Sequence, residues 1–177
     1  MQETEPEALQ KRLQKVHTGA QRSAHLVHQL LSLARTETDI TRSPLDVAAL
    51  AREVAREWTP RAVAAGVDLG YEGEDSLTIP GDKLLLREVL SNLIDNALRY
   101  AGKGVNVTLR TEVRDGFCIL EVEDNGPGLS TEHLERVFER FWRASELPGG
   151  CGLGLSIVAE IAMRHRGCLL YTSDAAD

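Results

Sequence analysis

The hydrophobic pattern of residues 5–38 predicts one long helix. Thr4 and Glu7 have the spacing of a capping box, and apolar residues then recur every three or four positions. The apolar face is wider than a two-stranded seam needs, so a helix that packs in a bundle is favoured. This periodicity stops near residue 38, and residues 39–45, which contain Pro44, are interpreted as a linker.

From residue 46 onward the helical and strand periods alternate. Asp46 can cap the first helix of this part and Gly66 can end it. The predicted helices cover residues 47–65, 80–102, 130–136 and 152–165. The predicted strands cover residues 67–72, 76–79, 104–113 and 117–124, and the last two are joined by a hairpin turn. Helices and antiparallel strands in one chain predict an α+β fold in two layers.

Composition narrows the classes of function. Of the 177 residues, 42% are hydrophobic, and the net charge is −7, which argues against a general nucleic-acid or membrane-surface binder. Three widely spaced cysteines without a CxxC motif indicate reduced thiols in a cytosolic compartment. The sequence contains no run of 18 apolar residues and no basic region after Met1, so neither a transmembrane span nor a signal peptide is expected.

The helix predicted for residues 80–102 carries polar side chains on one side. Glu88, Asn92 and Asn96 are four residues apart, and this spacing places them in one line along the helix. Carboxamides beside an apolar stripe have two interpretations. They can be satisfied polar groups at the rim of the helix, or they can supply oxygen ligands to Mg²⁺ together with phosphate oxygens.

The segment "EVEDNGPGLS", residues 121–130, predicts a tight polar turn after a strand. Gly126 and Gly128 permit positive φ or a close approach of the backbone. An ionised Asp124 accepts hydrogen bonds and cannot donate them, so it suits an exocyclic amine such as that of adenine. The alternative is a plain Asp-Asn-Gly turn without a ligand.

A third motif, "GGCGLGLSIV", occupies residues 149–158. Its four glycines precede an apolar helix start, where backbone N–H groups can bind an anion. Flexible turns have a similar composition, so this motif alone is weak evidence. It lacks the Lys and the Ser or Thr of a P-loop, and no βαβ unit surrounds it.

These three motifs, in this order and with "VFERFWRA" at residues 137–144, resemble the ATP-binding domain of sensor histidine kinases. That domain belongs to a superfamily shared with DNA gyrase, chaperone and mismatch-repair ATPases, and the resemblance covers roughly residues 44–167. It implies an α/β sandwich of the Bergerat type behind a long dimerisation helix. Residues 1–38 would be the second helix of a dimerisation domain, residues 46–170 the ATP-binding domain, and residues 171–177 a tail outside the family pattern.

The resemblance implies a site for ATP and Mg²⁺. Asp124 would accept from the adenine amine, while Gly126 and Gly128 would shape the purine slot. Asn96 would ligate Mg²⁺ and Asn92 would lie close to the phosphates. The other nucleotide-binding residues implied are Arg99 at a phosphate, Tyr100 beside the base, and Gly150, Gly152, Leu153, Gly154 and Leu155 in the second glycine motif.

A nucleotide lid is also implied by the resemblance. Gly152 and Gly154 would hold its hinge and the helix end that faces the phosphates. Phe138 and Phe141 would anchor its other edge, or would be core aromatics. His133, which follows the first glycine motif, is expected to be solvated.

The residue at position 92 bears on the reaction. In the superfamily's water-activating ATPases a Glu stands at the position that matches Asn92, and a carboxamide cannot take a proton as that Glu can. The site is therefore expected to hydrolyse ATP slowly and to keep the γ-phosphoryl group for a protein nucleophile. Glu88 is a further catalytic candidate that could orient Asn92 or polarise the acceptor, with a surface helix Glu as the alternative.

The resemblance implies transfer of the γ-phosphoryl group to a His of the dimerisation domain and then to an Asp of a response regulator. No segment resembles the family's His-Glu-Leu-Arg-Thr-Pro acceptor sequence, so His17, His25 and His28 are read as helix-surface residues. The intact protein would be a homodimer through the N-terminal helix, and this chain would be the cytoplasmic portion of a bacterial inner-membrane protein.

Two alternatives belong to other classes of function. One is a stand-alone kinase of the same fold that acts on a partner's Ser, as anti-sigma factors do. The other is a non-catalytic dimerisation module.

The C-terminal end departs from the family pattern. After "HRG", residues 165–167, the sequence lacks the strand that the family usually supplies, and this would leave an unpaired sheet edge.

Overall fold

The computed structural model describes residues 40–144 and 151–171, together with Leu9, Arg12, Leu13, Val16 and Val27, which have helical backbone. The rest of the helix predicted for residues 5–38 lies outside the described residues. Among the residues that are described, no helix has both the length and the hydrophobicity needed to span a membrane.

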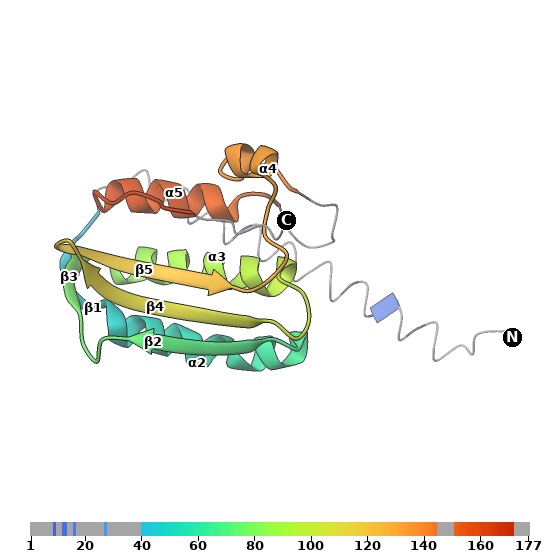
Figure 1. Cartoon of the computed structure of the whole chain (residues 1–177), viewed down its shortest axis with the longest axis horizontal. Helices are drawn as coiled ribbons and strands as arrows, with labels where there is room; N and C mark the ends of the chain where they lie inside the picture. Colours follow the sequence, from blue (N-terminus) through green and yellow to red (C-terminus); the bar gives the residue numbers. More distant parts are fainter. Residues whose placement is uncertain are drawn as a thin grey trace, which may run out of the picture.

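Helices and strands follow one another as the periodicities predict (Figure 1). The helices are α2 (Val47–Ala65), α3 (Lys83–Tyr100), α4 (Thr131–Arg136) and α5 (Gly154–Arg164). The strands are β1 (Ser43–Asp46), β2 (Asp68–Gly73), β3 (Thr78–Gly81), β4 (Asn106–Arg114) and β5 (Phe117–Asp124). Every helix and strand predicted from residue 46 to residue 165 is therefore confirmed.

The predicted linker differs from the structure at its C-terminal end. Residues 43–46 form β1, which pairs antiparallel with β3, so that Pro44 lies opposite Pro80. Both prolines are tolerated because, among the residues that the structure describes, this sheet has two strands and each strand has one edge without a ladder partner. Pro80 and Gly81 thus belong to β3, and α3 begins after its N-cap, Asp82.

The main sheet has the strand order β2-β4-β5. β4 and β5 form the predicted hairpin, and the turn residues Asp115 and Gly116 both have positive φ, as a two-residue hairpin turn of the primed type requires. β2 pairs in parallel with β4, a pairing that the sequence patterns did not indicate. A parallel pair needs a long crossover connection, and β3 and α3 supply it.

Asp46 and Gly66 delimit α2 as predicted. The Asp46 carboxylate accepts hydrogen bonds from the backbone N–H groups of Ala49 and Leu77 and from the Ser76 hydroxyl. These bonds favour the ionised form and lower the pKa of Asp46 from 3.8 to about 2. Gly66 ends the helix with φ 74°, a conformation that suits glycine.

The core lies between the helices and one face of the sheet (Figure 1). Leu50 of α2, Ile94 of α3 and Leu109 of β4 meet there and are almost fully buried. The opposite side of α3 packs on α5, where Leu85 and Val89 join a second cluster of apolar residues. The two-layer α+β architecture predicted from the sequence is confirmed, and α3 is the helix that contacts both the sheet layer and α5.

Candidate functional site

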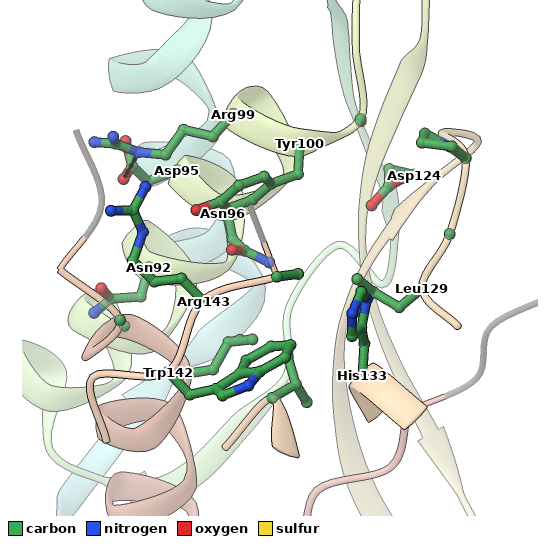
Figure 2. Close-up of a pocket in the computed structure, with 18 of the residues that line it drawn as sticks. Asn92, Asp95, Asn96, Arg99, Tyr100, Asp124, Leu129, His133, Trp142 and Arg143 are labelled. Atoms are coloured by element: carbon green, nitrogen blue, oxygen red, sulfur yellow. Dashed lines mark hydrogen bonds and ion pairs between the residues drawn. The ribbon is translucent and has the colours of Figure 1, made fainter. Parts of the chain in front are cut away.

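A cavity of about 400 Å³ opens where the C-terminal half of α3, the turn after β5, α4 and the start of α5 come together (Figure 2). Its volume lies in the range of small-molecule sites. Three motifs that are far apart in the sequence therefore converge. The residues that were predicted for the site and that line the cavity are Asn92, Asn96, Arg99, Tyr100, Asp124, Gly128, Gly152, Gly154 and Leu155.

Asn92 forms the innermost part of the α3 side and is only 7% exposed. Its Nδ2 donates to the backbone carbonyl of Glu88 at 2.9 Å and to Glu88 Oε1 at 3.0 Å. A Cβ at Gly154 would lie 3.0 Å from Asn92 Oδ1, so the first residue of α5 comes close to the amide oxygen because it is glycine. Glu88 does not line the cavity but holds the amide of the residue that does.

Arg99 lies further along the same side of α3. Its Nε donates to Asp95 Oδ2 at 2.6 Å, and Asp95 also pairs with Arg61 at 3.8 Å. The Asp95 side chain is 14% exposed and itself lines the cavity. Asp95 thus fixes the guanidinium group at the cavity edge. The spacing of four residues between an acid and an Arg was the available sequence signal for this pair.

Asn96 and Tyr100 lie between these groups and the turn after β5 (Figure 2). The Asn96 carboxamide makes no hydrogen bond with the part of the chain that the structure describes, so it can serve a ligand. Within residues 40–144 and 151–171, no three His, Cys, Asp or Glu side chains gather as a metal site. An oxygen donor at Asn96 fits Mg²⁺ only if phosphates and water supply most of the ligands, which is the usual mode for this ion.

The turn after β5 is pressed against the end of α3. Asp124 is exposed, and its Oδ1 accepts a hydrogen bond from the N–H of Gly126 at 2.9 Å. A Cβ on Gly126 would lie 2.7 Å from the Cα of Ala101, so only glycine permits this approach. Gly128 has φ 69°, and the chain turns there along the cavity. Gly126 acts behind Asp124 and is not part of the lining.

The side that faces α3 is largely apolar and was not predicted. It includes Leu129, Val137 and Trp142. His133 of α4, which was expected to be solvated, is half-buried and also lines the cavity. Its ring meets Trp142 edge-on, with centroids 5.4 Å apart. His133 belongs to no motif, and Trp142 stands in the Phe-containing motif of residues 137–144, from which only Phe138 and Phe141 were predicted for the site.

Other predicted residues lie elsewhere. Leu153 is fully buried in the cluster between α3 and α5 and does not line the cavity. Phe141 is 67% exposed, which excludes a core position, whereas Phe138 packs on the Tyr171 ring at 5.3 Å. Arg143 and Cys151 line the cavity without having been predicted. Gly150 lies outside the described residues.

Comparisons with known proteins agree with this arrangement. The sequence model of the family described as histidine kinase-, DNA gyrase B-, and HSP90-like ATPase matches residues 81–176. The sensor protein kinase PmrB of Pseudomonas aeruginosa is 34% identical over 170 residues, which are 93% of this chain and 35% of PmrB. The chain thus spans about a third of the length of the curated relatives it matches.

Solved structures give the same result. The Acinetobacter baumannii histidine kinase AdeS superposes with a TM-score of 0.74 at 26% identity, covering 99% of this chain and 82% of AdeS. Full-length ShkA in complex with AMPPNP also gives a TM-score of 0.74, at 27% identity, over 93% of this chain and 35% of ShkA.

Proposed function

The chain belongs to the histidine kinase-, DNA gyrase B- and HSP90-like ATPases, and within them to the sensor histidine kinases, and from this we propose that its cavity binds ATP with Mg²⁺. The proposal rests on one observation: Asp124, Asn96 and the residues from Gly152 to Gly154 border the same cavity. The relative ShkA was solved with AMPPNP, a nucleoside triphosphate analogue, which supports the same ligand class.

Asp124 would recognise the base. One of its carboxylate oxygens is engaged by the N–H of Gly126, and the second is left to accept from the exocyclic amine of adenine. Guanine carries a carbonyl oxygen at the corresponding ring position, and that oxygen would repel the carboxylate. The site is therefore expected to prefer ATP over GTP.

The phosphates would lie between α3 and the start of α5. Arg99 supplies a cation there, held in place by Asp95. The N-terminal end of α5 adds backbone N–H groups beside Gly154. Asn96 would hold Mg²⁺, which neutralises charge on phosphate oxygens when it is bound. Asn92 would keep its amide oxygen directed to this region because Glu88 accepts from its nitrogen.

We further propose that the site transfers the γ-phosphoryl group of ATP to a protein nucleophile and hydrolyses ATP only slowly. Asn92 cannot take a proton from a water molecule, and the Glu88 carboxylate is hydrogen-bonded to Asn92. In the proposed transfer, a His ring nitrogen of the dimerisation domain forms the new bond to phosphorus and ADP leaves. The phosphoryl group then passes to an Asp of a response regulator.

The N-terminal helix would bring two copies of the intact protein together. Leu9, Leu13 and Val16 have helical spacing and are each more than half exposed. Apolar side chains in such a stripe suit a helix bundle. We also propose that this chain is the cytoplasmic portion of a longer protein of the bacterial inner membrane.

Nucleotide binding is tested with Asp124→Asn. The Asn side chain has one acceptor oxygen, so it cannot accept from both the N–H of Gly126 and the adenine amine, as the carboxylate does. Isothermal titration calorimetry with ATP and Mg²⁺ should show affinity at least about tenfold weaker, since hydrogen bonds to charged groups contribute about 1.5–3 kcal/mol. Asp115→Asn in the β4–β5 turn is the matched control and should bind as the unaltered chain does. Equal affinity in both variants would refute the proposed base contact.

The phosphotransfer proposal makes a separate prediction about acceptors. Incubation of this chain with ATP labelled at the γ-phosphate should leave His17, His25 and His28 unmodified, because none lies in an acceptor-like sequence. Addition of a dimerisation domain that has its acceptor His should produce an acid-labile phosphate on that domain. Label on one of the three native histidines would contradict this assignment.

A further inference from the structure

The aromatic side of the cavity has no role in the proposed chemistry so far. Trp142 and His133 face the space that Tyr100, Asn96 and Asp124 also border (Figure 2). Both rings are half-buried, and Leu129 and Val137 continue the apolar surface next to them. The side chains proposed for phosphate and Mg²⁺ binding lie on α3, and the backbone N–H groups proposed for phosphate binding lie at the start of α5. This division separates a phosphate side from an apolar side.

The backbone fixes where Trp142 stands. The N–H of Phe141 donates to the carbonyl oxygen of Gly152 at 2.8 Å. A Cβ on Gly152 would lie 2.5 Å from the carbonyl oxygen of Trp142, so the two segments touch because residue 152 is glycine. Phe141 itself has φ 66°, which is uncommon for a bulky residue and persists only where the surroundings impose it.

Side-chain contacts hold the indole as well. The Arg136 guanidinium lies 5.6 Å from the centre of the Trp142 ring, and Arg136 is paired with Glu139. Arg136 does not line the cavity, so its guanidinium group contacts the indole from outside the cavity. His133 meets the indole at an angle of 60° from α4. Trp142 is thus restrained by its backbone, by a cation and by a second ring, while part of its surface remains on the cavity.

We propose that Trp142, supported by His133, contacts the base and ribose of the bound nucleotide and contributes to its affinity. This inference rests on the proposed function, because it requires the cavity to bind a nucleotide. A rigid aromatic ring on an apolar wall suits the flat base and the carbon face of the sugar, and stacking on an aromatic side chain favours a base whatever its identity. Asp124 would select adenine, and Trp142 would add affinity without selecting the base.

The first experiment uses tryptophan fluorescence. The chain has two tryptophans, and the other one, Trp58 of α2, packs on the core beside Arg61 and does not line the cavity. In a Trp58→Phe protein, Trp142 is the one remaining fluorophore of this kind. Titration with ATP and Mg²⁺ should change its emission with the same dissociation constant that calorimetry gives for the same protein.

Affinity measurements separate a base contact from a phosphate contact. Trp142→Ala should weaken ATP and ADP by the same factor of about ten, equivalent to about 1.4 kcal/mol. Trp142→Phe keeps a ring and should stay within about threefold of the unaltered chain. His133→Ala should have an intermediate effect because it acts through the indole. Thermal unfolding of each variant shows whether the fold is kept.

The outcomes are distinct. Unchanged Trp142 emission and unchanged affinity of a folded Trp142→Ala protein, with calorimetry still reporting ATP binding, would overturn this inference and leave the proposed function standing. A loss of affinity for ATP alone, with ADP unaffected, would also overturn it, since it would place Trp142 at the γ-phosphate. If the unaltered chain binds no ATP by calorimetry, the proposed function fails and the inference fails with it.

Discussion

Replacement of Gly126 by Ala tests whether close packing of the turn after β5 sets the position of Asp124. The new Cβ would lie 2.7 Å from the Cα of Ala101 and 2.9 Å from its carbonyl oxygen. Both atoms belong to the backbone at the end of α3, so they cannot move aside as a flexible side chain can. The same Cβ would lie 2.7 Å from Asp124 Oδ1. The substitution therefore forces the turn and the carboxylate away from α3.

The size of the shift follows from these distances. Ordinary contacts of a Cβ begin near 3.4 Å, so the turn must retreat by about 0.7 Å. The clash of the same Cβ with Asp124 Oδ1 displaces the carboxylate from residue 126 by a similar amount, which takes the 2.9 Å hydrogen bond between them outside the accepted range, and the bond proposed to adenine would be lost with it. A lost bond to a charged acceptor of about 1.5–3 kcal/mol corresponds to about 10- to 100-fold weaker binding. Overpacking should also lower the free energy of unfolding by about 1–3 kcal/mol.

Calorimetric titration with ATP and Mg²⁺ measures the first effect, and urea denaturation measures the second. Gly70→Ala is the matched control. Gly70 lies in β2, its φ is not positive, and an added Cβ would meet no atom within 4 Å. This control should bind ATP with unchanged affinity and unfold at a similar urea concentration.

One result would refute the reasoning. If the Gly126→Ala protein is folded and binds ATP within about twofold of the Gly70→Ala protein, then the packing of the turn on α3 does not position the base contact. A protein that fails to fold at 25 °C would refute the magnitude instead, because the expected loss is smaller than the stability of an ordinary domain.

Three further predictions concern the core, the helix cap and the cavity thiol. Ile94→Ala removes a fully buried side chain of α3 and should lower the free energy of unfolding by about 2–5 kcal/mol in urea; a loss under 1 kcal/mol would contradict its core position. Because the pKa of Asp46 is lowered from 3.8 to about 2, the stabilisation from its ionised form is present above pH 3.8 and is lost as the pH falls toward 2. Between pH 3.8 and pH 2 the melting temperature should therefore fall less for Asp46→Asn than for the unaltered chain. If the melting temperatures of the two proteins fall in parallel, the Asp46 cap is not the cause of the loss of stability in acid. Cys151 lines the cavity and should be protected from iodoacetamide by ATP and Mg²⁺, whereas the exposed Cys168 should react equally with and without nucleotide, as site-resolved mass spectrometry would show.

The helices and strands of the fold were predictable because their signals are local. Asp46 and Gly66 mark the ends of α2, and the period of two with the Asp115–Gly116 turn marks the hairpin. The parallel pairing of β2 with β4 was not predictable from periodicity. Alternation of apolar residues specifies which face of a strand is buried but does not specify the direction of its neighbour.

The candidate site likewise has residues that the sequence predicts and residues that it does not. Asn92, Asn96 and Asp124 stand in motifs whose residue types carry a chemical preference, and the structure brings all three to one cavity. Trp142 and His133 were not predicted to line the cavity, because an aromatic residue on a short segment is equally compatible with a core position and a surface position. Their contact with the cavity depends on how residues 141–144 pack beside Gly152, which is a long-range contact that no local pattern contains.

Helix α3 explains why the site and the core cannot be altered independently. One side of α3 places Ile94 in the core against the sheet, and another places Val89 against α5. Asn92 lies at the boundary of these two contacts, where its amide oxygen is 3.0 Å from the Cβ position of Gly154. Because the helix is rigid, a rotation that relieves a core defect also moves Asn92 relative to α5. Core substitutions in α3 should therefore weaken nucleotide binding at temperatures where the domain is still folded, and the phosphate side should be affected before the base side.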